Sequence, residues 1–337
     1  MTRLIARRLL MMPLLLLGIV TIAFGLTHFT KANPLSSILS PRQMSNPDVV
    51  AAAKARWGLD RSLPEQYMSY VGNLLTGNMG VSFRTNRPVA TDIRDRLPAT
   101  LELVVAAMLV GTAAGIALGV VAAHKRDGAL DHVARIFALV GSSIPVFWCG
   151  LIFLFIFSVQ LKWLPGPGRL DTRAIAPHTM TGFYTIDALL AGDVPTFWSA
   201  CVHLLLPALT LGWSVMGIIS RLVRGSMLDV LGQEYVLMAR AKGASDLRVL
   251  LNHALRNAML PTLTVIGFTF AYLITGAVLV ETVFSWPGIG SYAVDSVHTL
   301  DYPAIMGVTI VGGAAFLLAN LATDVSYVFA DPKIRLS

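Results

Sequence analysis

The sequence predicts an all-α polytopic membrane protein with six transmembrane helices, and three observations point to it. Hydrophobic residues make up 55% of the 337 residues and charged residues only 13%, which leaves too few charges to cover a globular surface. The mean hydropathy is +0.67, and the apolar residues gather in runs long enough to cross a bilayer. The Lys and Arg residues that give the net charge of +7 lie in short patches between those runs. Nucleic-acid binding, which needs basic residues gathered on one soluble face, is therefore excluded.

A transmembrane helix needs about 20 predominantly apolar residues. Six stretches meet or approach that length: Leu9–Phe29, Thr100–Ala123, Ile136–Val159, Ala200–Ile219, Leu263–Val280 and Ala304–Ala322. The first stretch follows basic residues, as the core of a signal peptide does. It is longer than such a core, and no small-residue cleavage site follows it, so we interpret it as a retained anchor.

Two features inside the predicted spans indicate local geometry. Pro145 in the third span and Pro207 in the fourth each lack a backbone donor and are expected to kink their helices. Gly111, Gly115 and Gly119 repeat at four-residue spacing in the second span. Small residues at this spacing let two helix backbones approach closely, which favours packing within the bundle.

The distribution of basic residues predicts the orientation. With the N-terminus in the cytoplasm, fourteen Lys and Arg residues fall on the cytoplasmic side, and the short outer loops contain only Lys162, Arg169 and Arg173. Nine more lie in the outer segment from Thr30 to Ala99, which exceeds the loop length over which the rule applies. Both termini are therefore predicted to be cytoplasmic.

The long outer segment contains helix signals of its own. Asn46 predicts an N-cap and Gly58 the end of the same helix. A second helix is expected to begin near Pro64, and an amphipathic stretch, Val89–Leu97, is expected to end at Pro98. We therefore predict an anchor helix with an extracytoplasmic domain over residues 1–95, and a core permease domain over residues 96–337 that includes a cytoplasmic loop at 220–262.

No group of residues predicts chemistry within the membrane. Ionisable side chains in the spans are few and lie near the ends, so the charged relay of a proton-coupled carrier is not predicted. Ser142 and Ser143 have no His or Asp at their depth to activate them, which argues against an intramembrane protease. The sequence has no G-x-x-x-x-G-K-[ST] motif for ATP. We expect no catalytic, cofactor-binding or metal-binding residue, and a conduit whose energy comes from elsewhere.

The loop at 220–262 is longer than a connection between antiparallel helices requires. Glu234–Lys242 contains good helix formers, and Gly243 stands where a helix would end in a left-handed conformation. A second helix, Asp246–Met259, carries an apolar stripe. The pair is predicted to project below the membrane, either as a knob for a cytoplasmic partner or as an amphipathic hairpin on the membrane surface.

Several motifs together resemble one family over nearly the whole chain. They are R-R-L-L at Arg7–Leu10, G-L-D at Gly58–Asp60, A-T-L-E-L at Ala99–Leu103, E-Y-V-L-M-A-R-A-K-G at Glu234–Gly243, H-A-L-R-N-A-M-L-P at His253–Pro261, E-T-V-F-S-W-P-G-I-G at Glu281–Gly290, D-Y-P at Asp301–Pro303 and D-P-K-I-R at Asp331–Arg335. In these motifs the chain resembles ABC importer permeases (binding-protein-dependent transport system inner-membrane components), and specifically the B-type subunit of dipeptide/oligopeptide importers. The Glu-Ala-Ala core of the general importer motif is absent, and Ala239 and Ala241 stand near its place.

The resemblance implies a type I ABC importer permease fold in the bacterial cell inner membrane, with one half of a pore that moves di- and oligopeptides. It also implies partners: a second homologous permease, one or two kinds of ATPase subunit, an extracytoplasmic peptide-binding protein, the peptide itself and membrane lipid. The helix before Gly243 would be a coupling helix that docks on an ATPase. Its expected coupling residues are Glu234, Tyr235, Ala239, Arg240, Ala241 and Gly243.

A second motif implied by the resemblance is the turn formed by Trp286, Pro287 and Gly288, which would lie at the outer gate where the binding protein docks. A tight Pro-Gly turn with a purely structural role is the other interpretation. Import of another solute, such as nickel or glutathione, is an alternative within the class, because related permeases share these motifs. A secondary transporter that works alone is an alternative outside it.

Overall fold

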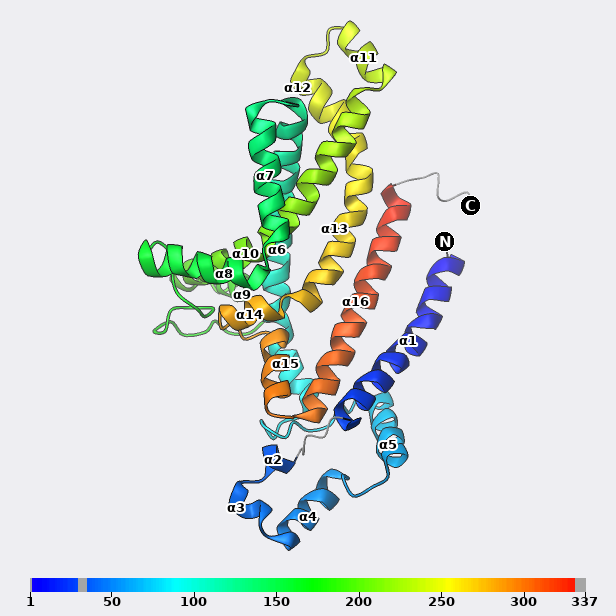
Figure 1. The fold of residues 1–337 in the computed structure, drawn as a ribbon, viewed down its shortest axis with the longest axis vertical. Coiled ribbons are helices and arrows are strands. Elements are labelled where there is room, and N and C mark those ends of the chain that lie inside the picture. Colours follow the sequence, from blue (N-terminus) through cyan, green and yellow to red (C-terminus); the bar gives the residue numbers. More distant parts are fainter. Residues whose placement is uncertain (1, 30–34, 331–337) are drawn as a thin grey trace.

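The computed structural model describes residues 2–29 and 35–330, and these form long helices with a group of short helices at one end (Figure 1). The helices are α1 (Thr2–Phe29), α2 (Leu35–Ile38), α3 (Pro41–Met44), α4 (Pro47–Trp57), α5 (Leu63–Leu75), α6 (Val89–His124), α7 (Ala129–Ser143), α8 (Val146–Phe153), the π-helix η1 (Leu154–Gln160), α9 (Tyr184–Leu190), α10 (Val194–Leu231), α11 (Glu234–Ala241), α12 (Asp246–Arg248), the π-helix η2 (Val249–Leu255), α13 (Arg256–Gly276), α14 (Val278–Val283), α15 (Ile289–His298) and α16 (Tyr302–Ala330). The C-terminal motif at 331–335 lies outside the described residues.

Four helices in the described part of the chain are long and apolar enough to cross a membrane, namely α1, α6, α10 and α16. Two bent pairs account for the other two predicted spans. Ala129–Ser143 and Val146–Gln160 form one pair, with a bend of 108°. Asp246–Met259 and Pro261–Ile274 form the other, with a bend of 54°. The polytopic helical architecture is therefore confirmed, with four continuous spans and up to six if each bent pair is one span.

The third predicted span is a broken helix rather than a kinked one. α7 ends at Ser143, and Ile144 has an extended backbone with φ −76° and ψ 135°. A residue before proline is pushed out of the α region by the pyrrolidine ring, and Pro145 then starts α8 without needing a backbone donor. α8 consequently runs sideways out of the bundle (Figure 1). The bend greatly exceeds the kink expected from proline alone.

The prediction that a helix ends at Pro98 is wrong. α6 continues through this proline from Val89 to His124, and α10 likewise continues through Pro207. Proline removes one hydrogen bond from a helix, and packing on both sides compensates for the loss. The predicted domain division at residues 95/96 falls inside α6 and stays a prediction.

The pair α6 and α10 forms the centre of the bundle, and the glycine repeat explains how closely they pack. A Cβ added to Gly111 would lie 2.5 Å from the Gly212 carbonyl oxygen, and one added to Gly119 would lie 2.7 Å from Cβ of Val223. Any larger side chain would force the helices apart, so the predicted packing role of the repeat is confirmed. α10 also contacts α7 and α13, α13 contacts α16, and α16 contacts α1.

The arrangement gives the molecule two distinct ends. α11 and α12 project from one end, and the first turn of α1 and the last turn of α16 point toward the same end (Figure 1). The short helices α2–α5 lie at the opposite end (Figure 1). The predicted coupling residues lie at the α11 end, and the Trp286 turn lies between α14 (Val278–Val283) and α15 (Ile289–His298).

Candidate functional site

The predicted coupling residues form one short helix and the turn that ends it. α11 covers Glu234–Ala241, and Gly243 follows with a left-handed φ of +83°. The Gly243 N–H donates to the Arg240 carbonyl at 2.9 Å, and the Ala244 N–H donates to the Ala239 carbonyl at 3.1 Å. A Cβ added at Gly243 would meet nothing within 4 Å. Glycine is therefore needed for the backbone conformation and not for space.

One side of α11 is anchored to the rest of the protein. Val236 is fully buried, and α11 packs against η2 and the end of α10. The Tyr235 hydroxyl accepts a hydrogen bond of 2.7 Å from Nδ2 of Asn257. A buried side chain and a side-chain hydrogen bond therefore both fix α11 to the rest of the bundle.

The other side of α11 is uncovered. Leu237 is 56% exposed and Met238 58% exposed, and they stand beside the exposed Glu234 and Arg240. Neighbouring apolar side chains on a helix that projects from the molecule are typical of a contact surface. We call these four residues the α11 surface. Ala239, one of the predicted coupling residues, is half-buried at its margin, whereas Ala241 is exposed.

A buried ion pair fixes the base on which α11 stands. The Asp131 carboxylate of α7 is fully buried and accepts hydrogen bonds from Nε and Nη2 of Arg224 on α10, both at 2.7 Å. The Asp127 N–H donates to the same carboxylate at 3.0 Å. This bidentate geometry is among the strong charge-assisted arrangements. α10 ends shortly before Gln233, the N-cap of α11, so the ion pair helps to set the position of α11.

The predicted outer-turn residues Trp286, Pro287 and Gly288 form a turn whose tryptophan is buried. Trp286 is 1% exposed, and its indole Nε1–H donates to the Ala99 carbonyl at 2.8 Å. A Cβ added to Gly288 would lie 2.4 Å from both Oε1 of Glu281 and Oγ1 of Thr100. Only glycine fits there, which favours the structural interpretation of this turn.

The hydrogen bonds of Glu281 and Thr100 join two of the sequence motifs. The buried Glu281 carboxylate accepts from the Thr100 hydroxyl at 2.6 Å and from the Ser291 N–H at 2.9 Å. The Thr100 hydroxyl oxygen in turn accepts from the Ile289 N–H at 2.8 Å. The motif at Ala99–Leu103 on α6 and the motif at Glu281–Gly290 are therefore two halves of one structure, which we call the outer-turn lock.

Beside the lock lies a second buried ion pair that sequence reasoning missed. Arg169, from the loop between η1 and α9, donates to the Glu102 carboxylate and, at 3.1 Å, to the Gly182 carbonyl. Its guanidinium carbon lies 3.6 Å from the centre of the Tyr184 ring and 5.4 Å from that of Trp286. In the sequence Arg169 indicates only topology, because no local pattern relates it to a carboxylate 67 positions away.

The backbone that receives Arg169 is held by a second carboxylate. Asp187 accepts hydrogen bonds from the Thr181 hydroxyl at 2.7 Å and the Gly182 N–H at 2.9 Å. Burial by itself raises the pKa of Asp187, but these hydrogen bonds outweigh it, so the pKa lies below its ordinary value. Asp187 is thus an anion that orders the 180–182 segment around Arg169.

Neither site has the features of a catalytic or metal centre. Within residues 2–29 and 35–330, no group of three or more His, Cys, Asp or Glu side chains is placed to hold a metal ion. The buried carboxylates of Glu281, Glu102 and Asp131 accept hydrogen bonds from other groups of the protein. Their arrangement is suited to holding helices in fixed relative positions.

Comparisons with known proteins give this architecture its context. Residues 115–336 match the family described as "Binding-protein-dependent transport system inner membrane component", and residues 1–104 match the N-terminal family of the same membrane component. The di/tripeptide transport system permease protein DppB of Pseudomonas aeruginosa is 42% identical over 332 residues, which cover 98% of each chain. The dipeptide transport system permease protein DppB of Escherichia coli is 39% identical over 337 residues, 99% of each chain.

A third relative is the probable D,D-dipeptide transport system permease protein DdpB of Escherichia coli, 40% identical over 321 residues, which cover 95% of this chain and 94% of the relative. The match therefore extends over both ends of the molecule, from the anchor helix to α16. The chain belongs to the binding-protein-dependent transport system inner membrane component family, as a multi-pass permease of the bacterial inner membrane.

Proposed function

We propose that this chain is the B-type permease subunit of an ATP-driven importer of di- and oligopeptides, in which it forms half of the pore. Its full-length relatives are named as dipeptide, di/tripeptide or D,D-dipeptide permeases, which favours peptides over nickel or glutathione. The chain itself performs no catalysis. ATP is hydrolysed by one or two kinds of partner subunit, a second homologous permease completes the pore, and an extracytoplasmic protein delivers the peptide.

The observation that carries the mechanism is the α11 surface, which projects from the bundle on an anchored helix. In the proposed mechanism this surface docks on an ATPase, and the residues predicted from sequence, Glu234 to Gly243, form the coupling helix and its end. Apolar Leu237 and Met238 supply the contact area, while Glu234 and Arg240 select the partner by charge. This assignment places the α11 end of the molecule and both termini in the cytoplasm, and α2–α5 outside.

Movement at α11 then reaches the far end of the molecule through packed elements. α11 moves together with α10, because the two helices are almost continuous in the chain. α10 in turn is held to α7 by the ion pair between Arg224 and Asp131. α10 moves with α6 along the close glycine contact at Gly111. α6 carries Thr100, which holds the outer-turn lock. Closing of the ATPases would thus open the pore outward, and their separation would return it to the inward-facing state.

The test replaces Gly243 by valine in the complete transporter, reconstituted in proteoliposomes with its ATPases, second permease and binding protein. A valine at φ +83° is strained, so the turn after α11 should change and ATP-driven peptide uptake should be lost while membrane insertion is normal. Gly232→Val is the matched control, because Gly232 has φ −82° and a Cβ there would make only ordinary contacts, the nearest 3.7 Å from the Asp229 carbonyl oxygen. Normal uptake by Gly243→Val would refute the coupling assignment.

A further inference from the structure

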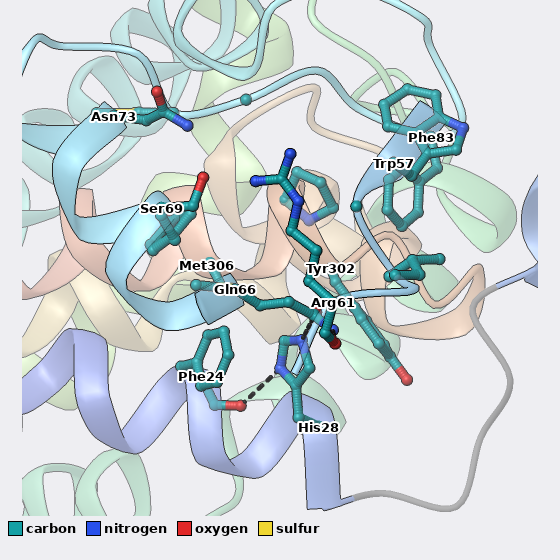
Figure 2. A pocket seen from close by; sticks show the side chains of 16 residues that line it. Phe24, His28, Trp57, Arg61, Gln66, Ser69, Asn73, Phe83, Tyr302 and Met306 are labelled. Carbon is teal, nitrogen blue, oxygen red and sulfur yellow. Dashed lines mark hydrogen bonds between the residues drawn. The ribbon is translucent and has the colours of Figure 1, made fainter. Parts of the chain in front are cut away.

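A cavity of about 180 Å³ lies at the end of the molecule opposite α11, between α1, the α4–α5 region, the segment at 79–83 and the start of α16 (Figure 2). Aromatic side chains from four separate parts of the chain line it. Trp57 and Phe83 meet edge to face with their ring centres 4.8 Å apart. Phe24 stacks on His28 with the ring centres 3.9 Å apart, and Tyr302 completes the lining.

The polar part of the lining offers donors that have no protein partner. The Arg61 side chain extends among the labelled residues in Figure 2, and its guanidinium forms no hydrogen bond or ion pair with the described residues 2–29 and 35–330. The Tyr70 hydroxyl is buried and also has no hydrogen-bond partner among those residues. A buried hydroxyl without a partner is unfavourable, so a ligand that supplies an acceptor would relieve the cost.

Arg61 is the cationic side chain of the lining, and the carboxylate that interacts with its charge, Glu65, belongs to the outside of the cavity. No Asp or Glu is among the residues that line the cavity. Asp60, next to Arg61 in sequence, and Glu65 both lie outside this lining, and Glu65 accepts from the Ser62 N–H at 2.9 Å. Gln66 is also engaged, because it contacts Nε2 of His28 at 3.2 Å and donates to the Arg61 carbonyl at 2.8 Å. The lining is therefore aromatic, with the Arg61 guanidinium and no carboxylate of its own.

We propose that this cavity binds the C-terminal residue of a short peptide, with the carboxylate on Arg61 and Tyr70 and the side chain against the aromatic walls. Arginine can bind a carboxylate through two parallel hydrogen bonds. A cavity of about 180 Å³ suits one terminal residue, because pockets for whole drug-sized ligands measure about 300–1,000 Å³. The inference rests on the proposed function, which takes the solute to be a peptide. The cavity would hold the peptide on the outer side of the membrane before it enters the pore.

The binding test uses the full chain in phosphatidylcholine nanodiscs and isothermal titration with glycyl-phenylalanine, its C-terminal amide and inorganic phosphate. We expect the free carboxylate to bind at least about tenfold more tightly than the amide, which lacks the charge. Arg61→Gln should weaken glycyl-phenylalanine binding about tenfold, and Tyr70→Phe about threefold. Arg56→Gln is the matched control, since Arg56 lies over the Trp57 ring at 5.5 Å but does not line the cavity.

Equal affinity for the dipeptide and its amide, or unchanged affinity in Arg61→Gln, would overturn the proposal. So would Arg61-dependent binding of inorganic phosphate without binding of the dipeptide, because that result assigns the cavity to a phosphate group. As an independent measurement, glycyl-photo-leucine should label Trp57, Phe83 or Met306, and labelling confined to other regions would contradict the placement.

The titration needs no ATPase, so its failure is distinct from failure of the proposed function. The latter would appear as absence of ATP-driven peptide uptake by the complete transporter. If uptake is normal in wild type and in Arg61→Gln, and the titration shows no difference between them, the cavity proposal alone is refuted.

Discussion

Replacing Thr100 by valine removes the central hydroxyl of the outer-turn lock without changing the size of the side chain. Thr100 is 1% exposed, and its Oγ1 donates to Glu281 at 2.6 Å and accepts from the Ile289 N–H at 2.8 Å. The variant therefore takes one partner from each of two buried groups. Each such loss costs about 1–3 kcal/mol, so the free energy of unfolding should fall by about 2–6 kcal/mol.

Thr262→Val is the matched control. Thr262 is also fully buried, but its Oγ1 bonds only to the Ala258 carbonyl of the same helix, at 3.0 Å. That carbonyl keeps its helical partner in the variant, so the cost should be about 1 kcal/mol or less.

The assay is thermal unfolding of the purified chain in mild detergent, followed with a thiol-reactive fluorescent dye. Unfolding exposes Cys149 and Cys201, both free, of which Cys149 is buried. Stability changes of this size shift the melting temperature by about 1–3 °C for each kcal/mol in a chain of this length. Thr100→Val should melt several degrees below Thr262→Val. Equal melting temperatures would refute the view that Thr100 holds the lock together.

Three further perturbations test the remaining contacts. Asp131→Asn should leave Arg224 without its charged partner. ATP hydrolysis by the complete transporter should then continue while peptide uptake falls several-fold. A parallel fall of uptake and hydrolysis would contradict the role of this ion pair in transmission. Glu102→Gln should destabilise the fold by about 3–5 kcal/mol, because it leaves Arg169 buried without a counter-charge. The double variant Glu102→Gln/Arg169→Met should melt at a higher temperature than the Glu102→Gln variant. Val236→Ala should weaken ATPase capture in a pull-down, because it removes the buried contact of α11, whereas Ala at the exposed Leu247 should not.

The features that local sequence patterns predict are those whose causes are local. The apolar runs predict the spans because a bilayer sets their length, and four of the six are continuous helices in the described residues, while the other two are bent pairs. Gly243 is predictable because a left-handed turn requires glycine wherever it occurs. The four-residue spacing of Gly111, Gly115 and Gly119 predicts a close helix contact, although it does not say that α10 is the partner.

The features that the sequence does not predict depend on distant partners. Pro145 indicates a disturbance of the helix, but the size of the bend depends on what α8 packs against, and a Cβ on Gly150 would lie 3.1 Å from the Phe284 ring. Pro98 looks like a helix end, yet packing carries α6 through it. The pairs Glu102–Arg169 and Asp131–Arg224 join segments far apart in sequence, so their charges appear locally as isolated residues near helix ends.

The central claim is that the α11 surface docks on an ATPase in the cytoplasm, and a site-specific photo-crosslinker at Met238 tests it most directly. Met238 is 58% exposed on α11, and Leu75, 85% exposed at the end of α5, provides the comparison at the opposite end of the molecule. In membranes that contain the complete transporter, we predict that the crosslinker at Met238 captures a P-loop ATPase and that the one at Leu75 does not. Capture of the ATPase from Leu75 and not from Met238 would contradict both the coupling assignment and the orientation of the chain.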